Sequence, residues 1–250
     1  VFRSDAVPFA AIFEPVPSFD APLPRVRVQD PAAIFFTSGT TGPAKGVIMS
    51  HAQMALFAQE LVDMTRLTDR DTYMACNPLF HGNAQFLAMY PALIVGARFV
   101  LREKYSATAW ADWVRDSKVT ITNLMGVMFD FIWKQPPKPN DADNDLRAMF
   151  AVPIPAFGDA FKKRFGFEVF VEAYGMTEVS MPMMTPYGEK GPQGACGKLV
   201  DQWFDVRIVD PETDEDVPEG ELGELLVQIG RAPSELQSRL HLVCRLLLEK

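Results

Sequence analysis

Residues 37–46 have the composition of a phosphate-binding loop. The stretch reads Thr37-Ser38-Gly39-Thr40-Thr41-Gly42-Pro43-Ala44-Lys45-Gly46. Its three glycines allow tight turns that bring backbone N–H groups close to an anion, its four hydroxyls add hydrogen-bond donors, and Lys45 adds a positive charge. A loop of this kind suits the triphosphate of ATP.

A Walker A loop is the nearest alternative, but it requires Gly-Lys-Ser/Thr and a helix that starts at once. Here the corresponding residues are Ala44-Lys45-Gly46, and the apolar run Val47-Ile48-Met49 follows them. Because a second apolar run, residues 32–36, precedes the loop, we expect the loop to join two strands. An ordinary Gly/Thr-rich turn would explain the glycines, but not four hydroxyls together with a lysine.

The elements after this loop alternate between strand and helix patterns. Ser50 and Gln53 form a capping box for a helix with one apolar face. That face consists of Met54, Phe57, Leu61 and Met64. Further strands are predicted at 72–76, 98–102, 119–124, 147–152 and 168–173, and further helices at 85–95, 106–117, 127–133 and 156–165. This order indicates an α/β fold with a mixed or parallel sheet covered by helices.

The chain divides by pattern into four segments. Residues 1–31 are rich in proline and are interpreted as a linker or incoming segment, and residues 32–193 form the α/β, ATP-binding part. Residues 194–228 contain two strand patterns, 203–209 and 224–228, around an acidic turn, which predicts a small β subdomain near the carboxyl terminus. Residues 229–250 form an atypical tail whose leucine spacing favours an amphipathic helix.

Composition excludes several classes of protein. The 250 residues are 48% hydrophobic, which is ample for a globular core, and their net charge of −8 without a long basic cluster argues against nucleic-acid binding. Three widely separated cysteines fit neither a disulfide framework nor a metal site, so a reducing, cytoplasmic setting is the simplest inference.

The most apolar region, residues 86–97, is too short and too interrupted for a transmembrane helix. The first residue is Val1 and no signal peptide follows it, so we expect the chain to begin inside a longer protein.

Three motifs follow one another along the chain: the loop at 36–47, then Asn77-Pro78-Leu79-Phe80-His81-Gly82, then Glu172-Ala173-Tyr174-Gly175-Met176-Thr177-Glu178. Over about residues 30–228 they resemble the adenylate-forming (AMP-binding) superfamily of acyl-CoA synthetases, luciferases and peptide-synthetase adenylation domains. The second and third motifs look most like acyl-CoA ligases of the carnitine/crotonobetaine type. The resemblance implies part of the large N-terminal domain of such an enzyme.

The resemblance also implies roles for individual residues. The β- and γ-phosphates of ATP would be held by Thr37, Ser38, Gly39, Thr40, Thr41, Gly42 and Lys45. Thr177 would contact the α-phosphate, Glu178 would bind Mg²⁺, and Tyr174, followed by Gly175 and Met176, would lie on the adenine. Lys45, Thr177 and Glu178 are therefore the predicted catalytic residues. For Glu178 alone, without its motif, a solvated loop carboxylate would be the favoured reading.

Two further positions leave alternatives open. Val152 and Pro153 occupy the place of the family's adenine-lining loop, although Phe150-Ala151 stands where the family commonly has glycines, and a strand end packed by prolines explains them as well. His81 matches the histidine that the family uses beside its acyl pocket. A lone histidine is otherwise more often structural.

The resemblance stops near residue 228. The family's Tyr-x-Thr-Gly-Asp-type motif, hinge and mobile domain with a catalytic lysine do not occur in the sequence, so the hypothesis is a truncated fragment, weakly active or inactive. The predicted activity is an acid–thiol ligase that uses ATP, Mg²⁺ and CoA as co-substrate to activate a small carboxylic acid, in fatty acid or carnitine metabolism. A catalytically silent ATP/AMP-binding or interaction module is the alternative, and a kinase-like loop is a third reading. The sequence identifies neither the acid nor the oligomeric state.

Overall fold

The computed structural model describes residues 25–37, 44–191 and 195–229. Its strands are β1 (Pro31–Thr37), β2 (Lys45–Ser50), β3 (Thr72–Ala75), β4 (Arg98–Leu101), β5 (Ile121–Met125), β6 (Ala148–Val152), β7 (Val169–Met176), β8 (Ser180–Met184), β9 (Lys198–Leu199), β10 (Phe204–Val209) and β11 (Glu224–Ile229). Its helices are α1 (His51–Thr65), α2 (Gly82–Ala84), the π-helical η2 (Gln85–Met89), α3 (Tyr90–Val95), α4 (Trp110–Asp116), α5 (Val127–Trp133) and α6 (Gly158–Phe165).

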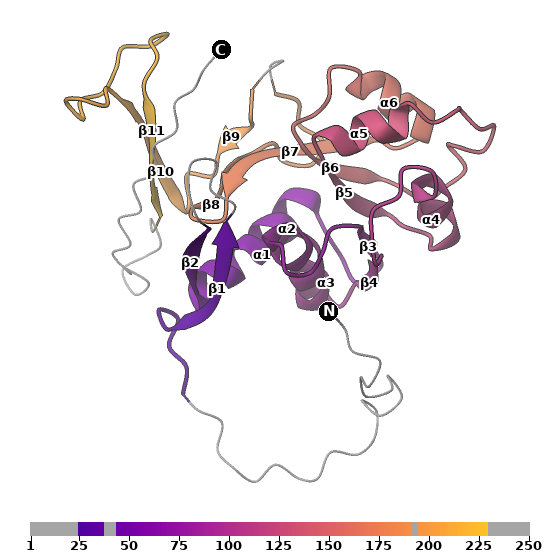
Figure 1. Ribbon diagram of the computed structural model, residues 1–250, viewed down its shortest axis with the longest axis horizontal. Helices are drawn as coiled ribbons and strands as arrows, with labels where there is room; N and C mark the ends of the chain where they lie inside the picture. The colour runs from indigo at the N-terminus through magenta and orange to yellow at the C-terminus, as the bar shows by residue number, and fades with distance from the viewer. Residues whose placement is uncertain (1–24, 38–43, 192–194, 230–250) are drawn as a thin grey trace.

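The largest sheet contains seven strands in the order β4-β3-β5-β6-β7-β8-β9. From β4 to β7 neighbouring strands are parallel, whereas β8 and β9 are added antiparallel at one edge. Two antiparallel hairpins, β1–β2 and β10–β11, form separate two-stranded sheets (Figure 1). The predicted α/β class with a mixed sheet is therefore confirmed.

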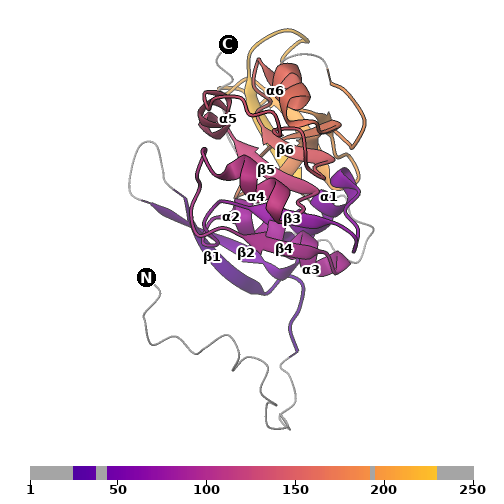
Figure 2. The same cartoon turned by 90° about the vertical axis from the view of Figure 1, so that its right-hand side faces the viewer.

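Two groups of helices cover opposite faces of the sheet. Along β3, Tyr73 and Ala75 belong to the hydrophobic cluster that includes residues of α1, whereas Met74 and Cys76 belong to the cluster formed with α4, α5 and α6. This alternation follows from the period of two in a strand, and β6 alternates in the same way. Figure 1 shows α4, α5 and α6 apart from α1, α2 and α3, and Figure 2 shows the same elements after a turn of 90°. The central strands are consequently buried on both sides.

The helical stretch predicted at 85–95 begins earlier and is not regular. It starts at Gly82 and includes a π-helical section in which the Tyr90 N–H bonds to the Gln85 carbonyl. Pro91, the next residue, has no N–H to donate, and its ring clashes with the preceding turn. The regular series of α-helical hydrogen bonds is therefore interrupted here. The helix predicted from Ser106, in contrast, begins later, at Trp110. The Ser106 hydroxyl accepts from the Ala109 N–H and so closes a turn that precedes the helix.

The carboxyl-terminal part of the described chain contains the predicted strand pair. β10 and β11 coincide closely with the expected strands at 203–209 and 224–228. The short β9, which falls inside the predicted 194–228 segment, pairs instead with β8 of the seven-stranded sheet. Of the predicted tail, residues 229–250, Ile229 is the last residue of β11 and residues 230–250 lie outside the described residues. Within the ranges that the structure describes, no helix combines the length and the apolar character needed to span a bilayer.

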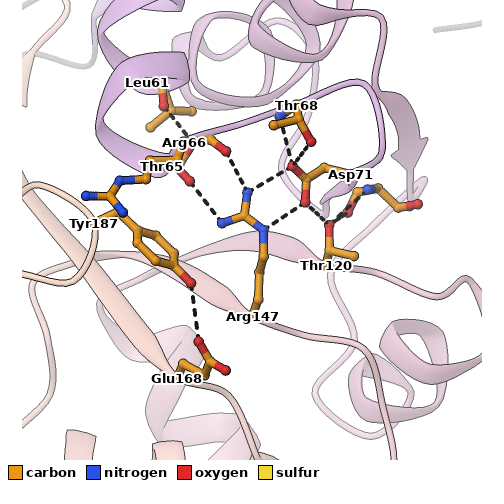
Figure 3. A network of polar contacts seen from close by, with 10 residues as sticks. Leu61, Thr65, Arg66, Thr68, Asp71, Thr120, Arg147, Glu168 and Tyr187 are labelled. Carbon is orange, nitrogen blue, oxygen red and sulfur yellow. Dashed lines mark hydrogen bonds and ion pairs between the residues drawn. The ribbon is translucent and has the colours of Figure 1, made fainter.

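Arg147, at the residue before β6, fixes the end of α1 to the sheet (Figure 3). Its guanidinium donates to the carbonyls of Thr65 and Arg66 at 3.0 and 3.1 Å and to both carboxylate oxygens of Asp71 at 2.8 and 2.9 Å. Burial raises the pKa of Asp71, but the hydrogen bonds that its carboxylate accepts from Arg147, Thr120 and the Thr68 N–H outweigh burial and bring it down to about 2. The carboxyl end of α1 therefore has one defined position.

Candidate active site

The predicted phosphate loop connects two paired strands. β1 and β2 are antiparallel, and Thr37 lies opposite Lys45 as the last described pair before the loop. The Thr37 hydroxyl is 3.5 Å from the Lys45 carbonyl, and the Lys45 side chain is exposed. A loop between two strands, and not the strand and helix of a Walker A loop, is thus confirmed. Ser38, Gly39, Thr40, Thr41 and Gly42 lie outside the described residues.

The parallel strands bring the other predicted residues to one edge of the sheet. β3, β5, β6 and β7 run in the same direction, so the segments that follow their carboxyl ends share that edge. The segment with His81 follows β3, Val152 ends β6, and Tyr174 lies in the last part of β7. Ligand sites of open α/β sheets form at this edge. The topology therefore gathers residues that are more than 90 positions apart, from His81 to Tyr174.

The Tyr174–Glu178 motif forms the end of β7 and a tight turn into β8. The Val179 N–H donates to the Met176 carbonyl at 3.2 Å, and β8 begins at Ser180. A Cβ added to Gly175 would lie 2.1 Å from the Ser180 carbonyl oxygen, so a glycine is required where the two backbones approach. Tyr174 and Met176 pack partly against the core cluster that includes residues of α1. This packing fixes the base of the turn that carries Thr177 and Glu178.

Gln53 links the phosphate-loop hairpin to this turn. α1 begins directly after β2, and the Ser50 hydroxyl caps it by accepting from the Gln53 N–H at 3.2 Å. In a complete capping box the Gln53 side chain would also bond to the Ser50 N–H, but the described contacts of Gln53 do not include this bond. Its side-chain amide instead donates to the carbonyls of Thr177 and Glu178, at 3.3 and 3.1 Å. The first and third motifs are therefore joined by one side chain.

His81 caps the helical stretch that starts at Gly82. Its Nδ1 accepts a hydrogen bond from the Asn83 N–H at 3.0 Å. Burial lowers the pKa of His81, which favours the neutral ring that this bond requires. Capping gives His81 a structural role of the kind left open from the sequence. It uses one ring nitrogen only, and the histidine lies on the same sheet edge as the motif of β7.

Three buried or half-buried amides beside His81 were missed from the sequence. The Asn83 side-chain oxygen accepts from the side-chain amides of both Asn77 and Asn123. Asn77 and Asn83 flank the histidine in sequence, but Asn123 comes from β5 and no local pattern connects it to them. The only available signal in the sequence was Asn123 itself, a residue type that is depleted in strands, inside the predicted strand 119–124.

Val152 and Pro153 lie at the carboxyl end of β6, as predicted. The Val152 carbonyl accepts from the Gly126 N–H at 3.0 Å, which ties the end of β6 to the segment after β5. The next residue, Ile154, donates its N–H to the Glu172 carboxylate on β7 at 3.0 Å. These contacts hold the strand end whether or not it also lines a nucleotide, so both readings from the sequence remain compatible with the structure. Glu172 is a further positioning contact that the sequence did not reveal.

A magnesium ion fits Glu178 only as part of a nucleotide complex. Among the described residues, no group of three or more His, Cys, Asp or Glu side chains is arranged to hold a metal ion. Mg²⁺ in nucleotide enzymes is commonly bound by one or two carboxylates, with phosphate oxygens and water completing its coordination. The half-buried Glu178, in a turn at the ligand edge of the sheet, meets this requirement.

Comparisons with known proteins agree with this arrangement. The chain is 35% identical over 208 residues to the crotonobetaine/carnitine–CoA ligase of Salmonella paratyphi B, a match covering 82% of this chain and 40% of that protein. ATP-bound MatB from Rhodopseudomonas palustris has 27% identity and a TM-score of 0.70 over 81% of this chain and 40% of its own. In fold alone, the chain is also similar to O-succinylbenzoate coenzyme A synthetase from Bacillus subtilis in complex with ATP and magnesium ion, at 21% identity and a TM-score of 0.69 over 84% of this chain and 43% of that one.

The chain thus spans 40% of the length of the curated relative that it matches. Residues 3–231, which include all three motifs, match the family described as AMP-binding enzyme. The phosphate-loop hairpin, the turn after β7 and the shared sheet edge are the parts of this match that the geometry brings together. The chain belongs to the AMP-binding enzyme family.

Proposed function

We propose that this chain carries the acid-activating site of an ATP-dependent acid–thiol ligase. In the first half-reaction, a carboxylate oxygen forms a bond to the α-phosphorus of ATP as the bond from that phosphorus to pyrophosphate breaks. In the second, the thiol of CoA takes the acyl group from the acyl-adenylate and AMP leaves. ATP, Mg²⁺ and CoA are the corresponding cofactor, metal and co-substrate.

The observation that carries the proposal is the contact of Gln53 with the carbonyls of Thr177 and Glu178. α1 continues directly from the strand that carries Lys45, so this contact ties the two regions that would hold opposite ends of the triphosphate. A turn or a surface carboxylate without a nucleotide role gives no reason for these regions to be tied. The family match over residues 3–231 supports the same function.

Each residue has a defined task in the proposed reaction. Lys45 and the loop before it neutralise the charge that develops on the departing pyrophosphate, and Thr177 donates to the α-phosphate. Glu178 would hold Mg²⁺, which would offset the negative charge of the phosphates. The Tyr174 ring packs on the adenine, with Val152 and Pro153 at the neighbouring strand end. His81 lies beside the acyl group.

Carboxylate-dependent exchange of labelled pyrophosphate into ATP tests the first half-reaction. We expect weak exchange with wild-type protein and a further loss on the order of a hundredfold in Lys45→Ala and in Glu178→Ala, because each removes one charge-stabilising group. Two exposed residues of the same types outside the predicted site, Lys163 on α6 and Glu219 before β11, provide matched alanine controls that keep the wild-type rate. The name of the curated relative makes crotonobetaine and carnitine the first acids to test, against a fatty acid.

The products separate the alternatives. ATP binding without exchange for any acid supports the silent nucleotide-binding module. Release of ADP or phosphate without AMP supports a kinase-like reaction. Exchange that persists unchanged in both Lys45→Ala and Glu178→Ala contradicts the assignment of these residues.

A further inference from the structure

Two polar side chains lie on the inward face of α1 where apolar residues are expected. Gln53 and Glu60 are seven residues apart, which is two helical turns and places them on one face of the helix. Both are buried, at 6% and 2% exposure. Burying an amide or a carboxyl is unfavourable unless it is hydrogen-bonded, so the partners of these groups indicate what they do.

Both partners belong to the turn that carries Glu178. Gln53 donates to the carbonyls of Thr177 and Glu178, near the start of the turn. Glu60 accepts from the Ser180 hydroxyl at 2.6 Å, where β8 begins. Residues of one helix therefore hold both ends of the four-residue segment 177–180.

The segment needs such support because its backbone is not relaxed. Ser180 has a φ of 66°, in the left-handed region that side-chain-bearing residues rarely adopt. Such conformations are unfavourable and persist only when surrounding contacts impose them. The hydrogen bond to Glu60, together with the packing of α1 against β8, is a contact of this kind.

Burial reduces the negative charge that Glu60 brings to the turn at neutral pH. Burial raises the pKa of Glu60 to about 8, while the Ser180 hydroxyl and the Met181 N–H act in the opposite direction and nearby Asp63 acts with burial. A protonated acid keeps its hydrogen-bonding capacity and avoids repelling the phosphates of a nucleotide held by the same turn. A permanently charged side chain at this position would weaken binding of an anion.

We propose that Gln53 and Glu60 are positioning residues that hold the Thr177–Ser180 turn so that the Glu178 carboxylate faces a Mg²⁺-nucleotide. This inference rests on the proposed function. Neither residue touches the nucleotide; each acts through the turn. Since α1 continues from β2, the helix also fixes the distance between the turn and the hairpin that carries Lys45.

The test measures ATP affinity with and without Mg²⁺ in variants of the 250-residue chain, by calorimetry. Gln53→Met has a similar length and lacks the donors. Gln59→Met is the matched control, because Gln59 is exposed on the same helix and its amide donates to Asp63, not to the turn. We expect Gln53→Met to lower Mg²⁺-dependent ATP affinity by about tenfold, the change expected from losing one or two hydrogen bonds. Affinity without Mg²⁺ should change much less, and Gln59→Met should bind as the wild type does.

Glu60 is tested by conservative rescue. Glu60→Gln keeps an acceptor for the Ser180 hydroxyl and should retain Mg²⁺-dependent binding, whereas Glu60→Leu should lose it. If Glu60→Leu does not fold, Ser180→Ala removes the same hydrogen bond from the other side. Equal binding by Ser180→Ala and the wild type would overturn the role of Glu60.

A readout without nucleotide separates this inference from the proposed function. Hydrogen exchange of the Val179 amide, which closes the turn onto the Met176 carbonyl, should accelerate in Gln53→Met and not in Gln59→Met. If the wild type binds no ATP, the proposed function fails. Faster hydrogen exchange of the Val179 amide in Gln53→Met would still support a turn held by Gln53. Unchanged exchange, or an unchanged effect of Mg²⁺ in folded Gln53→Met, overturns the positioning role.

Discussion

Removal of the Arg147 guanidinium tests the mechanism by which α1 is fixed to the sheet. In Arg147→Met the alkyl part remains, but Asp71, whose side chain is 6% exposed in the wild type, loses its charged partner. The carbonyls of Thr65 and Arg66 lose donors at the same time. Breaking a buried ion pair from one side costs about 3–5 kcal/mol. Because the Arg147 side chain is 26% exposed, we expect a loss of unfolding free energy near the lower limit of this range, at about 3 kcal/mol.

The pH dependence of the unfolding free energy gives a second value for the contribution of the Asp71 carboxylate. The pKa of Asp71 is lowered from 3.8 to about 2, a difference that corresponds to roughly 2.5 kcal/mol. Since the folded state binds fewer protons than the unfolded state between these values, this stability is present in full above about pH 4 and is lost as the pH falls through about 2. Arg147→Met should remove most of the dependence over this window.

Urea unfolding at pH 7 and at pH 3, followed by circular dichroism, measures both quantities. Arg207→Met is the matched control, because its ion pair with Asp216 is exposed, at 50% and 68%, and surface pairs contribute about 1 kcal/mol or less. Asp71→Asn combined with Arg147→Met should be less destabilised than the two single changes added together. If Arg147→Met and Arg207→Met lose equal stability, or if the two changes at Asp71 and Arg147 are additive, the reasoning is refuted.

Two further predictions concern the turn after β7. Between pH 4.5 and 8 the folded state holds a proton on Glu60 that the unfolded state releases, so the wild type should lose stability as the pH rises through this range; Glu60→Gln should show a flatter profile in urea unfolding, and parallel profiles would contradict the raised pKa. Gly175→Ala places a Cβ 2.1 Å from the Ser180 carbonyl oxygen, so it should lower the free energy of unfolding by about 1–3 kcal/mol and weaken Mg²⁺-dependent ATP binding. Gly191→Ala, whose added Cβ has neighbours at 3.8 Å, should change neither quantity appreciably, as measured by thermal unfolding and calorimetry.

The sequence predicted the elements that local chemistry determines. Apolar runs on both sides of residues 37–46 predicted a loop between strands, and the structure has Thr37 paired with Lys45. Strand and helix periodicity predicted the α/β order, and the parallel sheet then brings the end of β6 and the turn after β7 to one edge. These signals are local because a strand's alternation and a turn's glycines depend on neighbouring residues.

Contacts across the fold were not predicted because nothing local encodes them. Gln53 matched the capping-box pattern, but its amide bonds to carbonyls 124 and 125 residues away. Asn123 similarly reaches Asn83, which lies 40 residues earlier. β8 was missed since its pairing partner, β7, and not its own composition, makes it a strand. In each case the tertiary contact, which no short window contains, selects the local structure.

The pattern of α1 nevertheless contained a usable signal. Gln53, Phe57, Glu60 and Met64 follow spacings of four, three and four residues, which is the stripe that an amphipathic helix turns toward its core. Two of these four positions are polar, and polar residues at core positions are unfavourable unless they are satisfied. The apolar residues alone predicted which face is buried. The polar residues on that face are where the structure places the contacts to the Glu178 turn, so a break in the apolar stripe identifies supporting residues that no motif reveals.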